Sequence, residues 1–62
     1  MQLISAETLA RRLGVQPVTV YSWARRGAIP HYKVERNVRF DEAEIQEWLA
    51  AKKKPVKMAA GG

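Results

Sequence analysis

Two pairs of helix-breaking residues divide this chain and constrain its fold more than any other feature. Gly14 and Pro17 precede a short stretch without breakers, and Gly27 and Pro30 follow it. Proline suits the first position of a helix, while glycine suits the left-handed residue that follows a helix. The sequence therefore predicts a short helix that begins at Pro17 and ends at Gly27.

A second helix is predicted just before it, from Ser5 to Leu13. Ser5 is a good N-cap, and the acidic Glu7 suits the positive first turn of a helix. Apolar residues recur with helical spacing at Ala6, Leu9, Ala10 and Leu13. Only residues 14–16 separate the two helices, which is the connection of a helix-turn-helix.

After Pro30 the pattern changes to a period of two, which predicts a β-hairpin. We expect one face of the hairpin to carry the apolar side chains of Tyr32, Val34, Val38 and Phe40. We expect Lys33 and Arg39 on the other face. The tip would be formed by Glu35, Arg36 and Asn37.

The last predicted helix begins after Asp41. Asp41 as N-cap and Glu44 three residues later form a capping box, and Phe40 with Ile45 forms a hydrophobic staple. The apolar stripe of this helix consists of Ile45, Trp48 and Leu49.

This order of elements predicts a winged helix-turn-helix (α-α-β-β-α). It is mainly α with a small β-hairpin wing, in a single small domain over residues 1–52. Residues 53–62 show no periodicity and several breakers, so we expect a disordered basic tail there.

The composition argues against several classes of function. The sequence has no cysteine and one histidine, His31, so we expect no metal site, no cofactor and no catalytic residues. It has neither a membrane span nor a secretion signal, so a cytoplasmic protein is expected. We also expect no small-molecule ligand. The acids Asp41, Glu42, Glu44 and Glu47 suit helix capping and a solvated face better than catalysis.

Charge is unevenly distributed along the chain. The net charge is +5, and residues 11–40 hold seven bases against one acid. Residues 41–51 hold four acids and no base. A basic middle beside an acidic helix suits a polyanionic partner such as double-stranded DNA. Arg11 and Arg12 also suit a solvated face, although the first helix of this motif crosses the DNA backbone.

The helix over residues 17–26 has two chemically different faces. Val20, Trp23, Ala24 and Gly27 share the face expected to pack on the other helices. On the opposite face, Arg25 can pair with guanine and Val18 with a thymine methyl, and Gln16 at the entrance of the helix can pair with adenine. The expected DNA-binding residues of this helix are Gln16, Pro17, Val18, Thr19, Tyr21, Ser22, Arg25 and Arg26.

Several of these residues have a second interpretation. Arg25 and Arg26 also suit the negative C-terminal end of a helix, and Tyr21 also suits packing over the first helix. Trp23 and Trp48 are expected in the core rather than as stacking platforms for single strands.

Four segments resemble the excisionase-type winged-helix family, which is related to the DNA-binding domains of MerR-type regulators. They are "LARRLGV", "TVYSWARRG", "IPHYKV" and "RFDEAEIQEWL", within residues 3–49. The resemblance implies that the second helix enters the major groove and that the wing meets the adjacent minor groove or backbone. The wing residues expected at DNA are Lys33, Arg36, Asn37 and Arg39.

Two positions depart from the pattern of that family. Position 16 is often Ser or Thr followed by basic residues, whereas this chain has the uncharged Gln16, Pro17 and Val18. The wing turn often has Gly where this chain has Glu35, so we expect the left-handed residue at Asn37 instead.

Together these features predict a protein that binds double-stranded DNA sequence-specifically. The expected role is an excisionase, or recombination directionality factor, acting with an integrase, because MerR-type regulators usually carry a dimerisation helix and an effector domain. The alternatives are a small stand-alone transcriptional regulator and a protein-interaction module that keeps the fold without binding DNA. One module reads few base pairs, so we expect further copies side by side, or a larger partner, on the same site.

Overall fold

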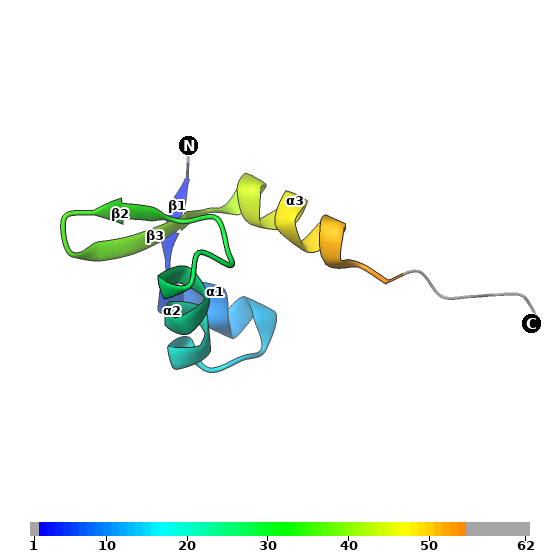
Figure 1. The fold of residues 1–62 in the computed structure, drawn as a ribbon, viewed down its shortest axis with the longest axis horizontal. Helices are drawn as coiled ribbons and strands as arrows, with labels where there is room; N and C mark the ends of the chain where they lie inside the picture. The colour runs from blue at the N-terminus through cyan, green and yellow to red at the C-terminus, as the bar shows by residue number, and fades with distance from the viewer. Residues whose placement is uncertain (1, 55–62) are drawn as a thin grey trace, which may run out of the picture.

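The computed structural model describes residues 2–54, and these form a winged helix-turn-helix, as predicted. Figure 1 shows the helix pair below a small sheet, with the hairpin and the last helix extending in opposite directions. The elements are β1 (Leu3–Ser5), α1 (Ala6–Leu13), α2 (Pro17–Arg25), β2 (Tyr32–Val34), β3 (Asn37–Asp41) and α3 (Glu42–Lys52). Most of the predicted tail lies outside the described residues.

The sheet contains one strand that was not predicted, β1. It pairs antiparallel with β3, so that the strand order is β1-β3-β2 and β3 lies in the centre. Ile4 stands opposite Phe40 and Ser5 opposite Arg39. A strand of three residues is too short to show the alternation by which strands are recognised in a sequence.

Both helices of the helix-turn-helix end as the glycines predict. Gly14 has φ 72° and Gly27 has φ 69°, and no neighbouring atom would obstruct a side chain at either position, so the backbone angle selects glycine. The Val15 amide donates to the Ala10 carbonyl at 3.0 Å, and the Ala28 amide donates to the Trp23 carbonyl at 2.8 Å. These bonds close Schellman turns and give both helices sharp ends. The regular part of α2 stops at Arg25, two residues before the predicted end.

The register of the hairpin differs from the prediction. Tyr32 pairs with Arg39 and Lys33 with Val38, so the turn contains only Glu35 and Arg36. A three-residue tip was expected, and the change of one residue reverses the faces of β2. Tyr32 and Val34 therefore share the face of Arg39, while Lys33 shares the face of Val38 and Phe40.

The left-handed residue of the turn is Glu35, with φ 60°, so the expectation that it is Asn37 was wrong. In a two-residue hairpin turn the positive φ belongs to the central residues, and Asn37 is already paired in β3. A residue with a Cβ is strained in this conformation, whereas glycine is not.

We expect Glu35→Gly to raise the free energy of unfolding by about 0.5–1 kcal/mol, because relief of the left-handed strain exceeds the extra flexibility of glycine. Urea titration followed by circular dichroism measures this change. The matched control is Glu35→Gln, which removes the same charge but keeps the strain, and should leave stability nearly unchanged. Equal gains from both variants would instead attribute the effect to charge.

The core lies between α1, α2 and the inner face of the sheet. Its largest fully buried side chains are Phe40, Leu9 and Val20. The remaining buried apolar residues are Ala6, Ala10, Ala24, Ile29 and Ile45. The predicted inward faces of α1 and α2 are confirmed at Leu9, Val20 and Ala24. Trp23, also expected in the core, is only half-buried, and Gly27 is exposed because it lies in the turn beyond α2.

The last helix, α3, is less buried than its predicted stripe suggests. Ile45 is in the core, but Trp48 is only half-buried and Leu49 is 39% exposed. The predicted capping box is absent, because the Asp41 side chain makes no capping hydrogen bond. Glu44 instead accepts a hydrogen bond from the Tyr32 hydroxyl at 3.2 Å. Burial, followed by this hydrogen bond, raises the pKa of Tyr32.

Within residues 2–54, the helices are all too short and too polar to cross a bilayer.

Candidate nucleic-acid interface

The outward face of α2 is open to solvent, as the helical spacing predicts. Val18 is 71% exposed, Tyr21 is 37% exposed, and Arg25 is also exposed. Val20 and Ala24 hold the opposite side of the same helix in the core. The outward face can therefore meet a ligand without any rearrangement of the core.

The beginning of α2 has polar groups that are not used in the fold. Gln16 occupies the N-cap position but makes no side-chain capping hydrogen bond, and it is exposed. Pro17 stands in the first turn, which contains no acid. Pro17, Thr19 and Ser22 are half-buried along the flank of the helix. The Gln16 amide and the positive end of α2 are therefore available to an anionic partner.

Tyr21 contacts α1, as its second interpretation suggested, but through a partner, Glu7, that was not predicted. Its hydroxyl donates to Glu7 Oε2 at 3.1 Å. This hydrogen bond is the main cause of a raised pKa for Tyr21; burial and the charge of Glu7 act in the same direction, and the charge of Arg39 acts against them. A phenol has one proton to donate, so Tyr21 cannot donate to a phosphate while it is bonded to Glu7.

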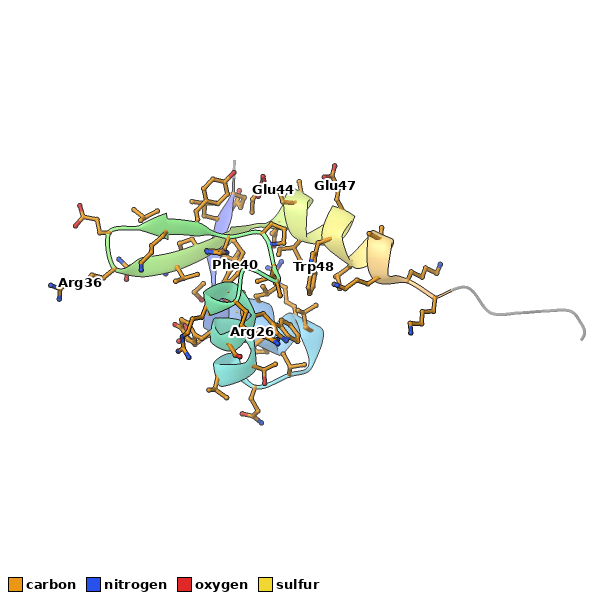
Figure 2. The ribbon with its side chains drawn as sticks, in the orientation of Figure 1. Arg26, Arg36, Phe40, Glu44, Glu47 and Trp48 are labelled. Carbon is orange, nitrogen blue, oxygen red and sulfur yellow. The ribbon has the colours of Figure 1, made fainter. Side chains whose placement is uncertain are left out.

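We expect Glu7→Gln to strengthen DNA binding about threefold to tenfold, because it removes a negative charge beside the outward face of α2. Fluorescence anisotropy with a labelled duplex at fixed salt measures the change. Glu47→Gln is the matched control, since Glu47 is exposed on α3 and points away from α2 (Figure 2). An equal gain from the control would mean that only net charge matters.

The wing contributes cations on both faces of its hairpin. Arg36 lies in the turn, at the far end of the molecule from α3 (Figure 2). Lys33 is exposed on the sheet face that carries Phe40, whereas Asn37 and Arg39 lie on the other face. The Arg39 guanidinium donates to the Val38 carbonyl at 2.9 Å, which restricts its freedom.

The arginines of α1 and of the end of α2 each have a different environment. Arg12 forms an ion pair with Glu42 and so ties α1 to the start of α3. Arg11 is exposed on α1. Arg26, one of the predicted DNA contacts, lines a groove beside Trp23 and Trp48 at the C-terminal end of α2.

Two acids of α3 and His31 have structural partners. Glu42 and Glu44 are used by Arg12 and Tyr32, respectively. His31 donates through Nδ1 to the Ile29 carbonyl at 2.9 Å. Among residues 2–54, no group of three or more histidine, aspartate or glutamate side chains is placed so that it could hold a metal ion.

The structure thus brings Val18, Tyr21 and Arg25 to one exposed face of α2, with Gln16 exposed at the N-cap, and it adds Glu7 to their neighbourhood. No periodicity could have revealed Glu7, because its contact with Tyr21 joins two helices across a turn.

Comparison with known proteins gives one finding of similarity. A family model described as a helix-turn-helix domain matches residues 3–53. This match covers all of the described helices and strands, and it supports a DNA-binding helix-turn-helix protein. Neither the curated proteins nor the solved structures contain a match to the chain.

Proposed function

Since the chain belongs to the helix-turn-helix domain family, we propose that it binds double-stranded DNA sequence-specifically and acts as an excisionase-type directionality factor beside an integrase. The observation that carries this proposal is the exposed face of α2. That face presents Val18, Tyr21 and Arg25 to solvent while Val20 and Ala24 fix the helix in the core.

In the proposed complex, α2 enters the major groove. Seven residues separate Val18 from Arg25, which corresponds to a rise of about 10.5 Å, or roughly three base-pair steps of ~3.4 Å. Arg25 pairs with a guanine edge, Gln16 reads an adenine edge, and Val18 packs on a thymine methyl. The half-buried flank residues Pro17, Thr19 and Ser22 lie at the backbone.

The wing is proposed to meet the neighbouring minor groove or backbone. Arg36 lies at the tip, and Lys33, Asn37 and Arg39 lie behind it on the two faces of the hairpin. Their positive charges act mainly on phosphates, which position a protein without specifying a sequence. Glu35 lies beside Arg36 in the turn, and its carboxylate opposes the approach of the tip to DNA.

The role beside an integrase rests on the resemblance to excisionases, together with the size of the module. One such domain covers about 600–1,000 Å² of DNA interface, which is small for a unique site. Copies bound side by side, or a larger recombinase bound next to one copy, would supply the remaining specificity.

Selection of bound duplexes from a random pool tests the proposed DNA recognition. The selected duplex should bind more tightly than a scrambled duplex, and log affinity should fall linearly with log salt, with a slope of about −0.9 for each phosphate neutralised. Failure to enrich any sequence, together with salt-independent binding, would contradict the proposal.

A recombination assay distinguishes the two roles of a DNA-binding protein. The selected site is placed beside the attachment site of a candidate integrase, and excision and integration products are measured with and without the chain. A shift toward excision supports a directionality factor. Unchanged products, with tight specific binding near a promoter, would favour the transcriptional regulator.

A further inference from the structure

An open apolar groove separates α3 from the ends of α1 and α2. It has a volume of about 480 Å³, and we call it the tryptophan groove because both tryptophans of the sequence line it. Leu13 and Leu49 complete its apolar walls. This volume lies within the range of sites that hold a ligand or a few side chains of a partner.

Specific contacts fix the two tryptophans that line the groove. Trp48 donates through Nε1 to the Ala28 carbonyl at 2.9 Å, and Ala28 belongs to the Schellman turn that ends α2. The rings of Trp23 and Trp48 are tilted by 50° with their centroids 5.7 Å apart. This hydrogen bond fixes Trp48, and with it α3, relative to the end of α2.

The rim of the groove is positively charged. Arg26, at the end of α2, and Lys52, at the end of α3, both line it, and none of the lining residues is acidic. The Lys52 Nζ lies 5.0 Å from the centroid of the Trp48 ring, which holds its charge over the apolar wall. Figure 2 shows Trp48 directed toward α2, whereas Glu44 and Glu47 point away from it. Within residues 2–54, Arg26 and Lys52 therefore form no ion pair with an acid of α3.

We propose that the tryptophan groove binds an acidic amphipathic segment of a partner protein. An apolar side chain of that segment packs between Leu49 and the two tryptophans, and its carboxylates face Arg26 and Lys52. Two cations bordering an apolar floor complement this pattern better than they complement a nucleic acid, whose phosphates would not use the floor. The proposal does not depend on DNA recognition by α2.

Tryptophan fluorescence provides a direct test, since both fluorophores line the groove. The probe is a synthetic helical peptide with Leu and Phe at positions i, i+3, i+4 and i+7, and Glu elsewhere. It should change the emission saturably, while the same peptide with Lys in place of Glu should not.

Two variants assign this binding to the groove. Lys52→Glu should weaken peptide affinity about tenfold because it reverses a rim charge, and Leu49→Ala should weaken it because it removes apolar contact. Arg11→Glu makes the same charge change as Lys52→Glu on exposed surface outside the groove and should have little effect. Circular dichroism verifies that each variant is folded, and Lys52→Glu should still bind the selected duplex in preference to a scrambled one.

Several results would overturn this assignment. Equal binding of the acidic and basic peptides, or no saturable change with either, would remove the charge argument. A fluorescence change with a single-stranded oligonucleotide but not with the peptide would make the groove a nucleic-acid surface. Self-association in sedimentation that is lost in Leu49→Ala, without peptide binding, would make the occupant a second copy of this chain.

Discussion

Replacing Phe40 with alanine should remove about 3–5 kcal/mol of folding free energy, which is a large share of the total stability of so short a chain. Phe40 is 0% exposed and is the largest of the fully buried side chains. It lies on the central strand, opposite Ile4 of β1. At about 0.05–0.15 kcal/mol per residue, a chain of this length has a total stability of roughly 3–9 kcal/mol.

Thermal and urea unfolding followed by circular dichroism measure the effect of Phe40→Ala. Val34→Ala is a suitable control, because Val34 is also an apolar strand residue but is 48% exposed on the hairpin. Its expected loss is below about 1 kcal/mol, in line with exposed positions. A Phe40→Ala protein that unfolds cooperatively with a similarly small loss would show that the core depends on other contacts.

Replacing Arg25 with alanine should weaken binding to the selected duplex by about 1–3 kcal/mol and relax the preference at one base position. Arg25 is exposed, and no ion pair holds it within residues 2–54. Its loss should therefore change the stability of the free protein by no more than about 0.5 kcal/mol.

Titration of selected, point-mutated and scrambled duplexes separates the possible roles of Arg25. Arg11→Ala is the matched control, since it removes another exposed arginine, on α1. An equal loss on every duplex would reassign Arg25 to the phosphate backbone, and an unchanged affinity would remove it from the interface.

The helical parts of the fold were predictable because their signals are local. Pro17, Gly14 and Gly27 determine where the helices begin and end through their own backbone preferences, and the structure agrees to within two residues. The inward and outward faces of α2 follow from the 3.6-residue period alone. The exposure of Arg25 and the burial of Val20 were predicted for that reason.

The sheet was less predictable because its geometry depends on residues far apart in the sequence. The faces of β2 depend on the number of residues in the turn, and the three-residue tip predicted around Glu35 was one residue too long. Glu44 lost its expected capping role because Tyr32, on the reversed face of β2, offered it a hydroxyl. One misjudged turn length thus accounts for two differences between expectation and structure.

In the candidate site, too, local features were predictable and contacts between elements were not. Its helix residues were predicted from spacing, but the Tyr21–Glu7 hydrogen bond was not, because it requires α1 and α2 to be packed at a particular angle. The position of Arg26 beside the tryptophans likewise depends on where α3 lies. Pairwise contacts between elements carry information that no single element contains.

The two-residue turn of the hairpin also limits how the wing can change in length during evolution. A ladder closed by such a turn grows regularly only when each strand gains one residue at the same time. A single insertion has to be absorbed by a bulge or a wider turn, which would carry Arg36 away from its present direction. Relatives with longer wings should therefore differ from this chain by even numbers of residues between Tyr32 and Arg39.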